Sequence, residues 1–123
     1  MSVVDKLASV AAAFPAARTV AFADLSSSMV LASQGRANIT QELLNRLCRQ
    51  ARASFDDPLF GLSVQAFGEP HCSVVMGPES VSVFLRSETD PADAICCLCD
   101  HGIDLAGFVA KLRDTLDQIS AGG

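Results

Sequence analysis

Apolar and polar residues follow two different periods along this chain, and each period predicts one kind of element. Residues 105–119 place apolar side chains at helical spacing and charged residues on the opposite side, which is typical of a helix packed on a sheet. Residues 94–99 form an unbroken run of apolar and sulfur-bearing side chains, as expected of a central strand buried on both faces. The C-terminal third therefore predicts a buried strand followed by an amphipathic helix, and Asp104 is placed to cap that helix.

Signals at helix ends locate two further helices. Ser2 with Asp5 forms the start of a capping box for an N-terminal helix, which Pro15 should end. Asn38 with Gln41 has the spacing of a similar capping box at the start of a second helix. Both segments continue with apolar residues on one side, so each is expected to pack on a sheet.

The full pattern predicts one α+β domain over residues 1–123 in the order α-β-β-α-β-β-β-α. The expected helices cover 2–14, 38–55 and 104–119, and the expected strands cover 19–25, 29–32, 72–76, 80–86 and 94–99. Residues 59–70 read as a connection with weak strand character, because glycines and a proline interrupt the alternation. Residues 120–123 read as a flexible tail.

The composition narrows the class of protein. A chain of 123 residues can bury one core, and half of its residues are hydrophobic, which excludes an intrinsically disordered chain. A net charge of −5 and the absence of Trp and Tyr argue against nucleic-acid binding, which needs clustered cations and stacking platforms. No apolar run approaches the roughly 20 residues of a membrane span, so no membrane partner is expected.

Two features bear on the cellular compartment. Residues 7–14 loosely imitate a signal peptide, but Asp5 and Arg18 flank the segment and its apolar residues are periodic. Five cysteines, an odd number without a convincing secretion signal, argue against a disulfide framework. We therefore expect a cytoplasmic protein whose reduced thiols fill its core.

The cysteines and histidines form one candidate metal site. If the cysteine-rich strand continued by two residues, Cys97, Cys99 and His101 would share one face. His71 and Cys72, on a neighbouring strand, could then complete a zinc site. The paired C-x-x-C spacing of such sites is absent, so no metal is expected. A small sensor or redox domain that uses this strand stays the alternative function.

The same groups are the candidate catalytic residues. Cys99 would be the nucleophile and His71 or His101 the base, but no third group orients either pair and no oxyanion loop is recognisable. The chain also lacks the G-x-x-x-x-G-K-[ST] motif of P-loop nucleotide binders. We expect neither an enzyme nor a bound cofactor.

The second helix has an apolar side that is broader than one small sheet requires. The apolar side carries Leu43, Leu44, Leu47, Cys48 and Ala51, and the polar side carries Arg46, Arg49 and Arg52. One interpretation is contact with a second copy of the chain, in which case Leu47→Glu should separate the copies. The other interpretation is that this side is simply core.

Three segments carry a family likeness that covers nearly the whole chain. They are Val20-Ala-Phe-Ala-Asp-Leu-Ser-Ser-Ser-Met-Val-Leu-Ala, the residues around Gly77-Pro-Glu-Ser, and Asp100-His-Gly-Ile-Asp-Leu-Ala-Gly-Phe. With this element order they resemble the Roadblock/LC7 family of small dimeric modules. Two departures are visible: residues 25–28 lack the Gly of the family's first hairpin, and Asp104 and Ala106 stand near positions where Asn and Leu-Gly are usual.

The resemblance implies a five-stranded antiparallel sheet, with the first and last helices on one face and the middle helix on the other. It also implies a homodimer, in which the middle helix meets its symmetry mate and an edge strand over 72–76 pairs with its copy. The interface would comprise Leu43, Leu44, Leu47, Cys48, Ala51, Cys72, Val74 and Met76. By resemblance, the protein is a non-catalytic regulator or scaffold of a Ras-like small GTPase or of a signalling or motor assembly. A bare structural dimerisation unit is the plainer alternative.

Overall fold

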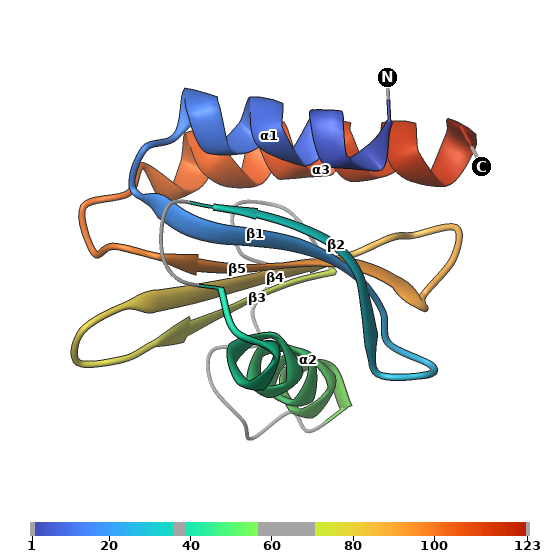
Figure 1. Ribbon diagram of the computed structural model, residues 1–123, viewed down its shortest axis with the longest axis horizontal. Helices are drawn as coiled ribbons and strands as arrows, with labels where there is room; N and C mark the ends of the chain where they lie inside the picture. The colour runs from blue at the N-terminus through green and yellow to red at the C-terminus, as the bar shows by residue number, and fades with distance from the viewer. Residues whose placement is uncertain (1, 36–38, 57–70, 123) are drawn as a thin grey trace.

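The computed structural model describes residues 2–35, 39–56 and 71–122, and its elements follow the predicted order (Figure 1). The helices are α1 (Val3–Ala13), α2 (Gln41–Asp56) and α3 (Leu105–Gly122). The strands are β1 (Ala17–Asp24), β2 (Met29–Gly35), β3 (Cys72–Met76), β4 (Val81–Arg86) and β5 (Asp93–Cys99). The predicted connection over 59–70 and the predicted helix start at Asn38 lie outside the described residues.

One antiparallel sheet separates two helical layers, which confirms the predicted fold class. The strands lie in the order β2-β1-β5-β4-β3. Figure 1 shows α1 and α3 side by side on one face and α2 alone on the other. Strand β5 occupies the centre, so the cysteine-rich run is covered on both faces, as its unbroken apolar sequence predicted.

Each layer has its own hydrophobic core. The larger core lies between the sheet and the α1/α3 layer and includes Leu7, Val10, Val20, Val83, Leu85, Ile95, Cys97, Cys99, Phe108, Leu112 and Leu116. The smaller core lies under α2 and comprises Ala23, Leu25, Leu47, Cys48, Ala51, Phe84, Ala94 and Cys96. Alternate residues of β4 and β5 enter opposite cores, as the period of two in a strand requires.

The first two helices begin at side-chain caps. The Ser2 hydroxyl accepts from the Asp5 backbone N–H at 3.1 Å, and the Asp5 carboxylate accepts from the Ser2 N–H, so the predicted capping box is confirmed. Helix α2 begins at Gln41, where the Thr40 hydroxyl accepts from the Leu43 N–H at 3.1 Å. The side chain of Thr40 thus satisfies one of the free backbone N–H groups in the first turn of the helix.

Helix α3 begins as predicted but ends later. The Asp104 carboxylate accepts from the Gly107 N–H at 3.4 Å. The helix then continues to Gly122, three residues past its predicted end. The Ser120 hydroxyl lies 3.2 Å from an Asp93 carboxylate oxygen and 3.3 Å from the Ser87 hydroxyl, and these contacts fix the last turn to the sheet. None of the described helices is long and apolar enough to cross a membrane.

The turn between β1 and β2 places a non-glycine residue in the left-handed region. Ser28 has a φ of 58°, and its hydroxyl accepts from the Arg52 guanidinium at 2.8 Å. The sequence had shown that this hairpin lacks the usual Gly, and Ser28 is the residue that takes its conformation. Left-handed backbone costs an L-residue about 1 kcal/mol.

This cost is measurable by comparing two substitutions that both remove the Ser28 hydroxyl. We expect Ser28→Gly to be more stable than Ser28→Ala by about 1 kcal/mol, because only Gly adopts this φ without strain. Urea denaturation followed by circular dichroism measures the difference. At the neighbouring exposed Ser27, which has no positive φ, the Gly variant should not exceed the Ala variant. Equal stability of the two Ser28 variants would contradict this account of the turn.

Candidate functional site

The structure does not bring the predicted cysteine and histidine residues together into one site. Cys97 and Cys99 do share one face, together with Cys72, but that face is the larger core. Strand β5 ends at Cys99, so His101 lies exposed in the following turn and does not join the thiols. His71 is half-buried and immediately precedes β3. Within the described ranges, no three His, Cys, Asp or Glu side chains come close enough to hold a metal ion.

Burial also opposes thiolate chemistry at the cysteines. All five are buried thiols. Burial, with a smaller contribution from Asp100, raises the pKa of the Cys99 thiol to about 12. Burial likewise raises the pKa values of Cys48, Cys96 and Cys97. Because the thiolate is the nucleophile and the metal ligand, these side chains act as small apolar groups in the core at neutral pH.

The thiols should therefore be unreactive in the folded protein. We expect none of the five to react with Ellman's reagent (5,5′-dithiobis-2-nitrobenzoate) within minutes at pH 8, and all five to react in guanidinium chloride. Absorbance of the released thionitrobenzoate gives the count directly. One thiol that reacts at once in the native protein would favour the sensor or redox function.

The predicted interface residues of α2 lie against the chain's own sheet. Leu44, Leu47, Cys48 and Ala51 are buried within the single chain, and Leu43 packs partly against the same core. The chain thus accounts for the apolar side of α2 without a second copy. The part played by these residues in a dimer stays a prediction.

Strand β3 is an edge strand, as the resemblance implied. Its Cys72 and Val74 side chains point into the larger core and are buried. Met76, at the end of the strand, is 55% exposed. The edge of β3 offers its backbone N–H and C=O groups to a second chain. Among the predicted interface residues, Met76 adds substantial exposed apolar surface to these groups.

The outward side of α2 is rich in arginine. Arg46, Arg49 and Arg52, which we call the arginine face, are all exposed. Arg52 donates to Ser28, and no ion pair joins any of the three to another described residue. In a chain with a net charge of −5, this face is a local concentration of positive charge.

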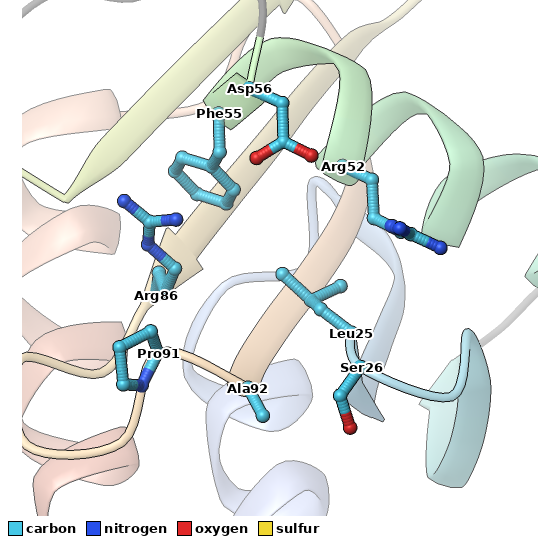
Figure 2. Close-up of a pocket in the computed structure, with 8 residues that line it drawn as sticks. All are labelled: Leu25, Ser26, Arg52, Phe55, Asp56, Arg86, Pro91 and Ala92. Carbon is cyan, nitrogen blue, oxygen red and sulfur yellow. The ribbon is translucent and has the colours of Figure 1, made fainter.

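Two pockets border the arginine face. One, of about 240 Å³, lies between α2 and the β3–β4 turn and has Arg46, Val75, Pro78 and Leu98 among its lining residues. The other, of about 230 Å³, lies between the last turn of α2, the β1–β2 turn and the β4–β5 loop (Figure 2). It is lined by Leu25, Ser26, Arg52, Phe55, Asp56, Arg86, Pro91 and Ala92. We call this second pocket the Arg86 pocket.

Arg86 is held firmly at the wall of its pocket. Its guanidinium carbon lies 4.6 Å from the centre of the Phe55 ring, a cation–π contact, and Figure 2 shows the two side chains next to each other. Its backbone carbonyl accepts from the Arg113 guanidinium at 3.2 Å. The Arg86 Nε atom is buried and has no hydrogen-bond partner among the described residues. A buried donor left unsatisfied costs about 1–3 kcal/mol.

The sequence alone predicts no role for these residues. The three arginines of α2 were visible at helical spacing, and a cluster of cations in an acidic chain is the signal that could have marked them. Arg86 and Phe55 offered no such signal, because they are far apart in the sequence and meet only when α2 packs on β4.

Comparisons with known proteins rest on structure alone. No protein-family model matches the sequence, and no curated protein matches it. Solved structures do match over nearly their whole length. A Roadblock/LC7 domain from Streptomyces avermitilis superposes with a TM-score of 0.72 at 11% identity, covering 96% of this chain and 94% of that one.

Two further solved structures agree. MglC from Myxococcus xanthus matches with a TM-score of 0.67 at 13% identity over 100% of both chains. The gliding protein MglB from Thermus thermophilus matches with a TM-score of 0.67 at 14% identity, covering 98% of this chain and 90% of that one. Identities this low establish a shared fold and nothing finer. The chain therefore has the Roadblock/LC7 fold.

Proposed function

We propose that this chain is a non-catalytic, homodimeric binding module that docks a Ras-like small GTPase on its arginine face. The observation that carries the proposal is that face: three exposed guanidinium groups on one helix, bordered by two pockets. Arginine is enriched in protein interfaces because its planar group donates several hydrogen bonds to carboxylates. The partner that complements this face presents an acidic surface.

The Roadblock/LC7 fold supports the choice of partner class. The sequence resembles a family whose dimers regulate or scaffold GTPases, and the fold agrees with that resemblance. All five thiols are buried, and burial raises the pKa values of Cys48, Cys96, Cys97 and Cys99, which disfavours the sensor or redox alternative. A platform without chemistry of its own can act on a GTPase only by binding one of its conformations more tightly.

The homodimer part of the proposal rests on β3. An edge strand leaves a row of backbone N–H and C=O groups open to pairing, and the exposed Met76 adds apolar surface at its end. Multi-angle light scattering should give the mass of two chains at micromolar concentration. The mass of one chain, unchanged by dilution or concentration, would contradict a dimer.

Binding to nucleotide-loaded GTPases tests the function directly. Small GTPases encoded in the same genome are loaded with GDP or with a non-hydrolysable GTP analogue and titrated by calorimetry. We expect at least one to bind, with about tenfold or greater preference for one nucleotide state. Equal affinity for both states, or no binding across the set, would remove the GTPase partner and leave a bare dimerisation unit as the better account.

A further inference from the structure

The Arg86 pocket has an apolar floor, and hydrogen bonds hold the backbone around it in place. Leu25 is buried at its base, with Pro91 and Ala92 beside it. The Leu25 N–H donates to the Ala92 carbonyl at 2.8 Å, which ties the β1–β2 turn to the β4–β5 loop. The Ser26 hydroxyl and N–H both donate to Asp24, at 2.6 and 3.0 Å, and hold the turn itself. The floor therefore exists before any ligand arrives.

Charged side chains lie around this apolar floor, with the positive and negative groups at different positions. In Figure 2 the Phe55 ring lies between the Arg86 guanidinium and the Asp56 carboxylate, and the Arg52 side chain points away toward the β1–β2 turn. Arg86 is anchored by its Phe55 contact and carries a buried Nε donor without a described partner. No described residue forms an ion pair with Asp56. One end of the pocket thus carries the positive charge of Arg86, and the other carries the carboxylate of Asp56, which is a hydrogen-bond acceptor.

The size of the pocket selects the kind of occupant. Sites for cofactors and small metabolites usually measure about 300–1,000 Å³. A pocket of about 230 Å³ is smaller, and it suits one or two side chains of a protein segment. Arg52 of the arginine face is one of the residues that line the pocket, so a protein that docks on that face also lies next to the pocket.

From these observations we infer that the Arg86 pocket binds a short segment of a partner protein in which an apolar residue adjoins an acidic one. The apolar side chain rests on Leu25 and Ala92, and the acidic carboxylate accepts from Arg86. A backbone N–H of the segment donates to Asp56. The inference needs a protein partner of this chemistry, but it does not rest on that partner being a GTPase.

The test uses the full chain, labelled with ¹⁵N, and two neutral-capped dipeptides as probes. Acetyl-leucyl-glutamate amide carries the proposed pair of groups, and acetyl-leucyl-glutamine amide lacks only the charge. Each is titrated to about 20 mM, because so few contacts give a dissociation constant of roughly millimolar size. We expect saturable shifts at Leu25, Phe55, Arg86 and Ala92, with at least fivefold weaker binding of the glutamine probe.

Variants of the full chain show whether the glutamate probe binds at Arg86 or responds only to the overall charge of the protein. Arg86→Gln should weaken binding of the glutamate probe about tenfold, and Arg86→Lys should keep the charge but lose most of the affinity. If Arg86→Gln fails to fold, Arg86→Lys alone carries the test. Lys6→Gln, on the other side of the sheet, removes the same charge and should change nothing.

Several results would overturn the inference. They are the absence of saturable shifts, equal binding of the two dipeptides, and unchanged binding in both Arg86 variants. Equal affinity for inorganic phosphate would also contradict it, because it would indicate a bare anion site without use of the apolar floor. Saturable, Arg86-dependent peptide binding in a protein that binds no GTPase would support the pocket while removing the proposed function.

Discussion

The Leu47→Glu variant is expected to unfold, rather than to separate two folded copies of the chain. Leu47 is 1% exposed and packs in the smaller core between α2 and the sheet. An unpaired carboxylate at such a site costs about 4 kcal/mol, a large part of the roughly 5–15 kcal/mol that stabilises a domain. Urea denaturation of wild type and variant, followed by circular dichroism, measures the loss.

The residue before Leu47 supplies the control. Arg46 is exposed on the same helix turn, so Arg46→Glu should change the free energy of unfolding by less than about 0.5 kcal/mol. A Leu47→Glu protein with native stability and half the wild-type mass would contradict this account. Such a result would mean that Leu47 faces another chain.

Phe108→Ala is expected to lose about 3–5 kcal/mol of stability, the usual cost of removing a fully buried aromatic ring. Phe108 is completely buried in the larger core, and its ring meets the Phe14 ring edge to face at 5.2 Å between centres. A double-mutant cycle with Phe14→Ala should give a coupling of about 0.5–1.5 kcal/mol for the pair. This contact joins the end of α1 to α3, so it stabilises the whole layer.

Exposed Val4 on α1 is the matched control for the Phe108 experiment. Val4→Ala should change the free energy of unfolding by less than about 0.5 kcal/mol. A loss below about 1 kcal/mol in Phe108→Ala would show that the larger core can collapse around the missing ring, contrary to the packing described above.

The order and type of the elements could be predicted from the sequence because their signals are local. The apolar run of β5, the helical spacing of α3 and the Ser2–Asp5 capping box each depend on residues within a few positions of one another. The missing glycine of the first hairpin was also visible, although only the structure shows that Ser28 takes its place. Elements specified by nearby residues form in the structure where the sequence predicts them.

The predictions that differ from the structure concern features that depend on contacts between residues far apart in the sequence. The end of α3 depends on Ser120 meeting Asp93 and Ser87, and no pattern near residue 120 reports those partners. The apolar side of α2 illustrates a different limit. Periodicity shows that a helix face is buried, but it does not say whether the chain's own sheet or a second chain buries it.

The candidate site was less predictable than the fold. Arg86, Phe55 and Leu25 come from three separate parts of the chain and meet at the end of α2. The histidines were weighed as candidate ligands and bases because of their chemistry, yet His101 lies exposed and apart from the buried thiols. A residue type suggests a function only when the fold brings its partners to it.

Charge reversal on the arginine face tests whether a GTPase docks there. Arg49→Glu and Lys6→Glu change the net charge equally, but the first lies on α2 and the second on α1, across the sheet. The measurement is the dissociation constant of each variant for the GTPase that binds the wild-type chain. We expect Arg49→Glu to weaken binding at least tenfold, since it puts like charge against an acidic partner, and Lys6→Glu to leave binding within about twofold. Undiminished binding of Arg49→Glu, or an equal loss in both variants, would contradict docking on the arginine face.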